Sequence, residues 1–158
     1  MAGSAARSEA RKPSGGSDAR ERLVRAACDL FSRNGVQISN RDGVRSFVTL
    51  DGSTVRELAG PAWTGARHQS LAEAIVPAGG QTIEHRHLQT EEIYYFVAGR
   101  GRMRLGDDES DVAAGDCVVI PPGTPHKLFN GEDATTPLVL LCCCAPPYSD
   151  DDTVMTGH

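Results

Sequence analysis

The sequence predicts an all-β domain, folded as a sandwich or closed barrel and preceded by one amphipathic helix. Seventeen glycines and nine prolines in 158 residues are too many for a helical bundle of this length. Apolar residues at helical spacing occur only before Gly35, and beyond it short β-prone runs follow one another with turn residues between them. Many short strands at near-regular spacing are typical of sandwiches and barrels. The length suits one domain with a short extension.

The first part of the chain is polar and then helical in pattern. Residues 1–17 are rich in Gly, Ser and Ala, and we predict that they form a disordered tail. Asp18 and Glu21 form a capping box at the start of a helix that reaches to about residue 34. Apolar positions recur along it at helical spacing: Leu23, Ala27, Leu30 and Phe31. We assign residues 18–43 to this helix and a linker.

The remainder of the chain, residues 44–158, is predicted to form the barrel. Its β-prone runs cover 46–50, 54–58, 70–76, 81–87, 93–98, 102–105, 117–120, 126–130 and 138–144. Turn signals separate these runs, among them Asp51-Gly52, Gly99-Arg100-Gly101 and Pro121-Pro122-Gly123. The sequence shows no internal repeat and no second barrel, so one small β-barrel is the predicted architecture.

The net charge of −5 is unevenly distributed along the chain. Residues 1–45 contain nine Lys and Arg against five Asp and Glu, whereas residues 46–158 contain seven against sixteen. An acidic body repels phosphate backbones, so we expect no nucleic-acid partner for the barrel. No run approaches the roughly 18 apolar residues of a membrane span, and the N-terminus lacks an apolar signal-peptide core. We therefore expect a cytoplasmic protein with no membrane partner.

The five cysteines do not form the pattern of a disulfide framework, because their number is odd and Cys142, Cys143 and Cys144 are consecutive. Reduced thiols fit the expected cytoplasmic location. Alternation along a strand turns one or two of these three side chains toward the interior, where a free cysteine packs as a small hydrophobic group.

Four side chains form the most informative pattern in the sequence. His85 and His87 are two residues apart on a predicted strand, so their imidazoles project from the same face. Glu92 begins the next strand after a short turn, and His126 follows the rigid turn that starts at Pro121. Together they predict three imidazoles and one carboxylate around one metal ion, with coordination positions left open.

This mixed donor set suits borderline divalent transition metals: Fe(II), Mn(II), Co(II), Ni(II), Cu(II) or Zn(II). The set contains no thiolate, which disfavours a closed structural zinc site. Four protein ligands leave two positions of an octahedron for substrate and dioxygen, so iron is favoured.

The glycines and prolines around these ligands resemble the two sequence motifs of the cupin superfamily. The first motif comprises Gly79, His85, His87, Glu92 and Gly99. The second comprises Gly115, Pro121, Gly123, His126 and Asn130, and it is complete at every position. The similarity extends from about residue 54 to 153 and is to small single-domain bacterial cupins with an RmlC-like, type-2 conserved barrel.

The resemblance implies a double-stranded β-helix, or jelly-roll barrel, with four metal ligands: His85, His87, Glu92 and His126. It also implies a homodimer formed through barrel strands. The implied function is that of a metal-dependent enzyme acting on a small molecule, with a dioxygenase narrowly favoured over an isomerase, lyase or decarboxylase. The alternative from another class is a non-catalytic, ligand-binding sensor cupin.

Three further residues are candidates for contact with a substrate. If Glu92 points inward, alternation places Tyr94 inward as well and Tyr95 on the outer face. Tyr94 could donate a hydrogen bond to a substrate, or it could be a core tyrosine with a satisfied hydroxyl. Gln69 and Glu73 share one face of a predicted strand and could line the pocket.

The predicted helix resembles the first helix of TetR-type transcriptional regulators. Those proteins need two further helices to place a recognition helix in the major groove, and the β-prone segment after Gly35 provides neither. Packing of this helix against the barrel or a dimer partner is therefore preferred to DNA binding.

Overall fold

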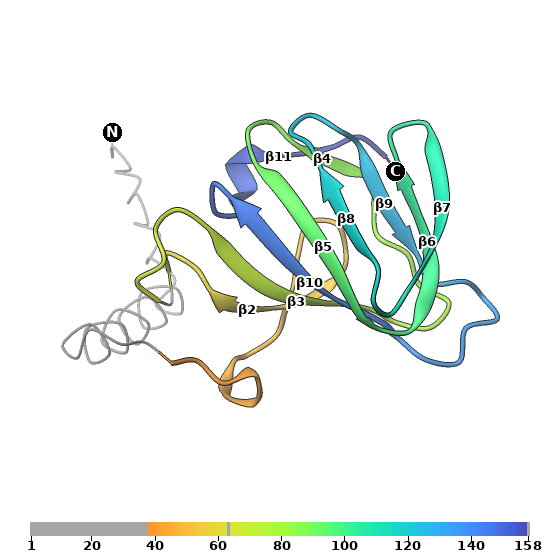
Figure 1. Cartoon of the computed structure of the whole chain (residues 1–158), viewed down its shortest axis with the longest axis horizontal. Coiled ribbons are helices and arrows are strands. Elements are labelled where there is room, and N and C mark those ends of the chain that lie inside the picture. The colour runs from red at the N-terminus through yellow and green to blue at the C-terminus, as the bar shows by residue number, and fades with distance from the viewer. Residues whose placement is uncertain (1–37, 63, 158) are drawn as a thin grey trace, which may run out of the picture.

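The computed structural model describes residues 38–62 and 64–157. The predicted tail and the predicted helix lie outside these residues. The regular structure of the described chain is almost entirely β-strand, arranged as the two sheets of a double-stranded β-helix (Figure 1). This arrangement confirms the predicted fold class. None of the helices in the described ranges is long and apolar enough to cross a membrane.

Two antiparallel sheets make up the barrel. The six-stranded sheet has the order β1 (Phe47–Val48), β2 (Thr54–Ala59), β3 (Ser70–Val76), β10 (Leu138–Ala145), β5 (Glu91–Ala98) and β8 (Cys117–Ile120). The five-stranded sheet has the order β11 (Thr153–Met155), β4 (His85–His87), β9 (His126–Phe129), β6 (Arg100–Leu105) and β7 (Asp108–Ala113). Two short 3-10 helices, η1 (Arg41–Gly43) and η2 (Asp150–Asp152), precede β1 and β11.

The hydrophobic core lies between the inner faces of the two sheets. The six-stranded sheet contributes Phe96, Leu138 and Leu140, and the five-stranded sheet contributes Met103 and Leu128. Strand β5 shows how the sequence produces this arrangement, because every second side chain in its first part is buried. As predicted from alternation, Tyr94 is buried and Tyr95 is 46% exposed.

Two strands were not predicted from the sequence. In β7 (Asp108–Ala113) Val112 is the one buried residue, so the strand lacks the alternation that would reveal it. β11 (Thr153–Met155) has three residues and follows a run of aspartates, and its pairing with β4 depends on the tertiary fold. The run predicted over 81–87 is shorter in the structure, with an isolated bridge at Gln81 and a strand from His85.

The turn between β5 and β6 requires a glycine. Gly99 has a φ of +86°, a backbone conformation that L side chains rarely adopt. A Cβ atom at this position would also collide with the carbonyl oxygen of Pro137. The close approach lets the end of β5 reach the start of β10, so this glycine of the first motif serves the fold.

Candidate metal centre

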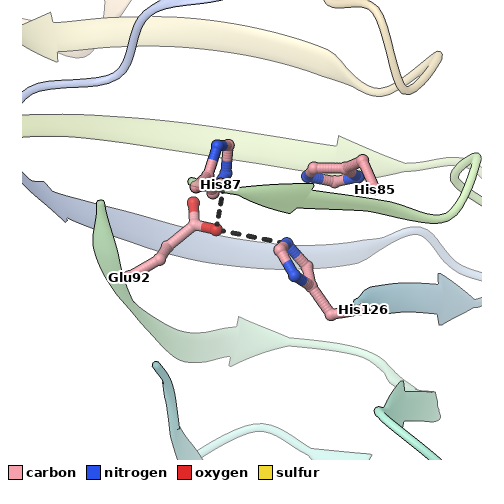
Figure 2. Close-up of side chains that lie close together, drawn as sticks. All are labelled: His85, His87, Glu92 and His126. Atoms are coloured by element: carbon pink, nitrogen blue, oxygen red, sulfur yellow. Dashed lines mark ion pairs between the residues drawn. The ribbon is translucent and has the colours of Figure 1, made fainter. Parts of the chain in front are cut away.

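The four predicted ligands meet in the interior of the barrel. His85 and His87 come from β4, Glu92 from β5 and His126 from the start of β9 (Figure 2). One potential ligand atom of each residue lies within 4.8 Å of the corresponding atom of every other, and all four residues are buried. The sequence pattern therefore predicted a true spatial cluster, one that is able to hold a divalent metal ion.

Backbone pairing brings the ligands together from two directions. His85 lies opposite His126 in the register between β4 and β9. The proline-rich turn before His126 is tied to β4, because the N–H of Gly123 donates to the carbonyl of His87 at 2.6 Å. Two strands and one rigid turn thus hold the three imidazoles before any metal binds.

Hydrogen bonds at the other ring nitrogen define how two of the imidazoles are protonated. Nδ1 of His85 lies 3.0 Å from the carbonyl oxygen of Ile83, and Nδ1 of His126 lies 3.0 Å from that of Thr124. A carbonyl oxygen only accepts, so each Nδ1 carries the proton. The lone pair is then on Nε2, the nitrogen available to a metal.

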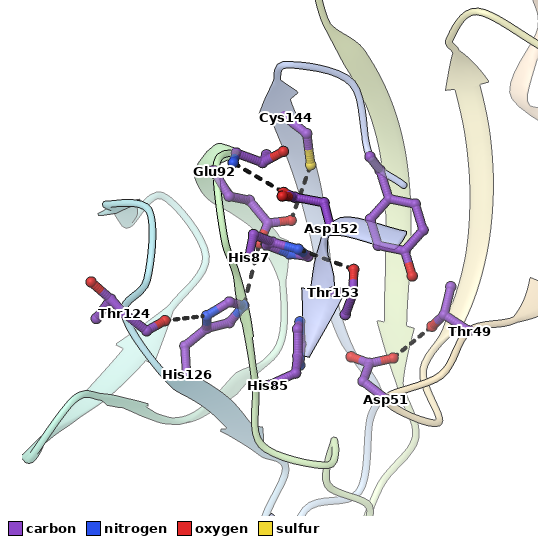
Figure 3. Close-up of polar contacts among 12 residues, drawn as sticks. Thr49, Asp51, His85, His87, Glu92, Thr124, His126, Cys144, Asp152 and Thr153 are labelled. Carbon is purple, nitrogen blue, oxygen red and sulfur yellow. Dashed lines mark hydrogen bonds and ion pairs between the residues drawn. The ribbon is translucent and has the colours of Figure 1, made fainter. Parts of the chain in front are cut away.

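Nδ1 of His87 carries the proton as well, because its hydrogen-bond partner is a hydroxyl group that can only accept from it. This Nδ1 lies 3.1 Å from Oγ1 of Thr153 (Figure 3). That hydroxyl donates to the carbonyl of Ser149 at 2.9 Å. A hydroxyl has one proton to donate, so Thr153 accepts the Nδ1–H of His87. All three imidazoles therefore offer Nε2 as a lone-pair donor.

The carboxylate of Glu92 completes the cluster. Its Oε2 lies 3.3 Å from Nε2 of His87 and 3.3 Å from Nε2 of His126. Its Oε1 accepts the Sγ–H of Cys144 at 3.3 Å. Within the described residues, Oε2 and the two Nε2 atoms are buried and have no hydrogen-bond partner.

These unpartnered atoms provide the test of whether a metal fits. Buried polar atoms are almost always hydrogen-bonded, because leaving them bare costs free energy. Here three atoms that offer lone pairs point toward one another, an arrangement that is repulsive between them and favourable around a cation. The donor set, with imidazole nitrogens and one carboxylate oxygen, is the set that borderline divalent metals take.

Positive charge at the centre of the cluster is what stabilises the anion of Glu92. Burial opposes the charged form of Glu92, but hydrogen bonds and charge from His126 and His87 outweigh it and lower the pKa of the carboxyl to about 2. This effect requires protons on the two Nε2 atoms; where these atoms are unprotonated, a cation bound between them would stabilise the carboxylate instead. Burial and the neighbouring His126 lower the pKa of His85. Glu92 is thus an anion and His85 a neutral ligand near neutral pH, which are the forms that bind metals.

A cavity opens beside His85, His87 and Glu92. Its volume is about 70 Å³, enough for a few water molecules or a small ligand. Tyr94 lies in its wall, and burial and the charge of Glu92 raise the pKa of the hydroxyl. Cys142 and Cys144 also line the cavity while Cys143 is exposed, so two of the three consecutive cysteines face inward.

Gln69 and Glu73, which alternation suggested as pocket-lining residues, are not among the residues that line this cavity. The cavity face of β3 carries the alternate residues Ser70, Ala72, Ala74 and Val76. Gln69 is exposed and immediately precedes β3 in the sequence. Glu73 lies on the outer face of the sheet, where its two oxygens pair with Arg41 at 2.6 Å and Arg56 at 2.9 Å.

Sequence reasoning missed two residues that support the ligands. Cys144 pairs with Glu92 in the register between β10 and β5, and alternation could not say which of the cysteines would face inward. Thr153 is 66 residues from His87, the residue that it contacts. No local pattern in the sequence indicates either contact.

The chain belongs to the cupin superfamily, as its two motifs predicted. The family model of the cupin domain matches residues 72–144. The uncharacterized protein MJ1618 of Methanocaldococcus jannaschii is 48% identical over 89 residues, which cover 56% of this chain and 71% of that protein. Protein SchB of Streptomyces halstedii is 32% identical over 88 residues, which cover 56% of this chain and 64% of SchB.

Several solved structures share the fold at low sequence identity. Pac13 of Streptomyces, described as a nucleoside dehydratase, superposes with a TM-score of 0.63 at 16% identity, covering 77% of this chain and 92% of Pac13. A predicted oxalate decarboxylase from Thermotoga maritima superposes with a TM-score of 0.60 at 19% identity, covering 70% of this chain and 99% of that one. These similarities establish the barrel and leave the reaction open.

Proposed function

We propose that this cupin is a metal-dependent enzyme that acts on a small molecule in the cavity beside the four ligands. The proposed ligands of its one divalent transition metal are His85, His87, Glu92 and His126. The observation that carries the proposal is the group of three buried, unpartnered donor atoms on His87, His126 and Glu92. Such atoms are costly to bury unless a cation satisfies them.

The residues of the chain prepare this site in two ways. The partners of the three Nδ1 atoms fix each imidazole so that Nε2 faces the centre. The hydroxyl of Tyr94 stays protonated because burial raises its pKa, so it can donate a hydrogen bond to a molecule in the cavity. A divalent metal held there supplies Lewis-acid chemistry, or redox chemistry with dioxygen if it is iron.

The reaction class is the finer part of the proposal. The open coordination positions expected of a four-ligand site support an iron-dependent dioxygenase. The names of the structural neighbours, a nucleoside dehydratase and a predicted oxalate decarboxylase, favour an elimination or decarboxylation that needs only a Lewis acid. The identity of the bound metal separates these two classes.

Elemental analysis of protein purified without a metal-chelating tag tests the proposal. We expect one divalent metal per chain, and near-complete loss of it in His87→Ala, because this substitution removes one of the four donor atoms that hold the metal. His68→Ala is the matched control, since His68 is exposed and remote from the cluster in sequence. Its metal content should equal that of the unaltered protein.

Each outcome has a defined meaning. Iron would support oxygen chemistry and call for oxygen-uptake assays with small-molecule panels. Zinc, nickel or manganese would support isomerisation, elimination or decarboxylation. Absence of metal after reconstitution with each of these cations would contradict the proposal and leave a metal-free binding module.

We also propose a homodimer, the assembly that the family resemblance implies. The adjacent strands β5 and β8 support it, because Tyr95, Val97 and Val119 are 46%, 42% and 51% exposed on the outer face of the sheet. Sedimentation equilibrium measures the assembly directly, and a monomer at micromolar concentration would contradict this part of the proposal.

A further inference from the structure

The cavity beside the metal cluster contains a second carboxylate, that of Asp51. This residue lies in the turn between β1 and β2 and lines the same cavity as His85 and Thr153 (Figure 3). In the sequence it is recognisable only as the first half of an Asp-Gly turn. The structure places it where a molecule bound beside the metal ligands would meet it.

Hydrogen bonds hold the carboxylate of Asp51 in one orientation. Its Oδ1 accepts from the backbone N–H of Ser53 at 3.0 Å, from the hydroxyl of Ser53 at 2.8 Å and from that of Thr49 at 2.5 Å. The hydrogen bonds found for this carboxylate in the described chain thus all go to Oδ1. Oδ2 remains as an acceptor for a bound molecule.

The backbone of Asp51 is coupled to the metal cluster through a single residue. The N–H of Ile83 donates to the carbonyl of Asp51 at 2.7 Å. The carbonyl of Ile83 accepts the Nδ1–H of His85 at 3.0 Å. Asp51 and His85 are therefore positioned by the same short segment, so their separation is set by the fold and not by a mobile loop.

The cavity carries negative charge and no positive side chain. Its acidic lining residues are Asp51, Glu57 and Glu92, and its described lining includes no Lys or Arg. The nearby guanidinium of Arg56 is engaged with Glu73 on the outer face of the sheet. A carboxylate or phosphate entering the cavity would find no counter-ion other than the metal itself.

The acidic side chains of the cavity outweigh the charge of a divalent metal. A divalent cation contributes +2, the carboxylates of Glu92, Asp51 and Glu57 contribute −1 each, and metal-bound imidazoles are uncharged. This sum of −1 disfavours an anionic ligand. The rest of the wall combines apolar side chains such as Val55 and Leu140 with the hydroxyl groups of Ser70 and Thr82.

We infer that the substrate is an uncharged small molecule carrying hydroxyl groups, and that Asp51 is the residue that selects it. Asp51 accepts a hydrogen bond from a substrate hydroxyl and repels anionic molecules of similar size. The inference rests on the proposed function, since it assigns the substrate class of the same metal site. It predicts that oxalate is a poor ligand for this cupin.

Asp51→Asn is the informative substitution. The amide oxygen can keep the hydrogen bonds that Oδ1 accepts within the turn, while the negative charge is lost. Asp51→Ser is a second neutral variant whose hydroxyl can form a similar turn, and it serves if the first does not fold. Asp107→Asn in the turn between β6 and β7 is the control, because it removes one charge outside the cavity.

The experiment measures binding with Co²⁺-loaded protein, whose visible absorption reports ligands entering the metal site. The probes are oxalate and the uncharged diol ethylene glycol. We expect oxalate to bind at least about fivefold more tightly to Asp51→Asn than to the unaltered protein, as removal of one nearby charge requires. Ethylene glycol should bind more weakly to the variant, and Asp107→Asn should match the unaltered protein with both probes.

The outcomes separate this inference from the proposed function. Equal oxalate affinity in the unaltered protein and both neutral variants would overturn the inference and leave the metal site standing. Failure of the unaltered protein to take up Co²⁺ in equilibrium dialysis would overturn the proposed function and the inference with it.

Discussion

Cys144 is not one of the four proposed ligands, but its side chain orients the carboxylate of one of them, Glu92. Cys144 lies opposite Glu92 in the pairing of β10 with β5 and donates its Sγ–H to Oε1. Burial and the charge of Glu92 raise the pKa of the thiol, so it remains a donor at neutral pH. With Oε1 engaged in this way, Oε2 is the oxygen directed at the imidazoles of His87 and His126.

Replacing this thiol should therefore weaken metal binding without removing a ligand. We expect Cys144→Ala to lower metal affinity by about tenfold, the lower end of the effect of losing a partner that orients a ligand. Cys144→Ser should keep most of the affinity, because its hydroxyl can donate to the same oxygen. Competition with a fluorescent zinc chelator measures both values.

The control for this prediction is Cys143→Ser, since Cys143 is exposed on the other face of β10. It should bind metal as the unaltered protein does. Equal affinity of Cys144→Ala and the unaltered protein would show that Glu92 is oriented by its strand alone.

At the scale of elements, the C-terminal segment clamps the part of the barrel that carries the ligands. β11 pairs with β4, with Thr153 opposite His87. Just before β11, the carboxylate of Asp152 accepts from the backbone N–H groups of Gln89 and Thr90 at 3.0 and 3.1 Å. These two groups lie in the turn between β4 and β5, so Asp152 holds the turn that separates His87 from Glu92.

Loss of this clamp should destabilise the protein in a pH-dependent way. Burial opposes the charge of Asp152, but the hydrogen bonds from Thr90 and Gln89 outweigh it and lower the pKa of this carboxyl below its usual 3.8. A lowered pKa in the folded state contributes stability that is present above about pH 4 and is lost on further acidification. Asp152→Ala should cost about 1 kcal/mol at pH 7.

Urea denaturation at pH 7 and pH 3 measures this dependence. The difference in unfolding free energy between Asp152→Ala and the unaltered protein should shrink at the lower pH. Asp151→Ala is the comparison, because Asp151 contributes its backbone N–H and not its carboxylate to the hydrogen bonds of η2. An equal difference at both pH values would exclude the carboxylate charge as the source of the stability.

At the scale of the whole molecule, the site joins the two sheets. Glu92 and Cys144 belong to the six-stranded sheet, whereas His85, His87 and His126 belong to the five-stranded one. The cluster therefore exists only when the sheets have packed together. The proposed metal binding is therefore linked to folding, since an unfolded chain cannot present this donor set.

This linkage predicts that metal removal lowers thermal stability. At a free metal concentration about a hundredfold above the dissociation constant, binding adds about 2.7 kcal/mol to the unfolding free energy. Calorimetric scans with metal and with a chelator should show a lower Tm in the chelator. The shift should vanish in His87→Ala, and an unchanged Tm in the unaltered protein would contradict a metal site that spans both sheets.

Much of the fold could be predicted because its signals are local. Most strands could be predicted from the alternation of apolar and polar residues and from the turn residues between them. β7 was missed because its side chains are mostly exposed, with Val112 as its one buried residue. Gln69 and Glu73 were predicted to share one strand face, but β3 begins only at Ser70. Nothing local says which face of β3 the core takes. The packing of β3 against the opposite sheet determines which of its two faces is buried.

The sequence by itself determined which four side chains form the candidate metal cluster. His85 and His87 lie on one face because side chains alternate with a period of two, and Glu92 and His126 follow turns whose residues allow few conformations. Only the tertiary structure decided what surrounds them. Cys144, Thr153 and Asp51 reach the site through strand register and loop packing between segments far apart in the chain, and such long-range pairing leaves no periodic trace in the sequence.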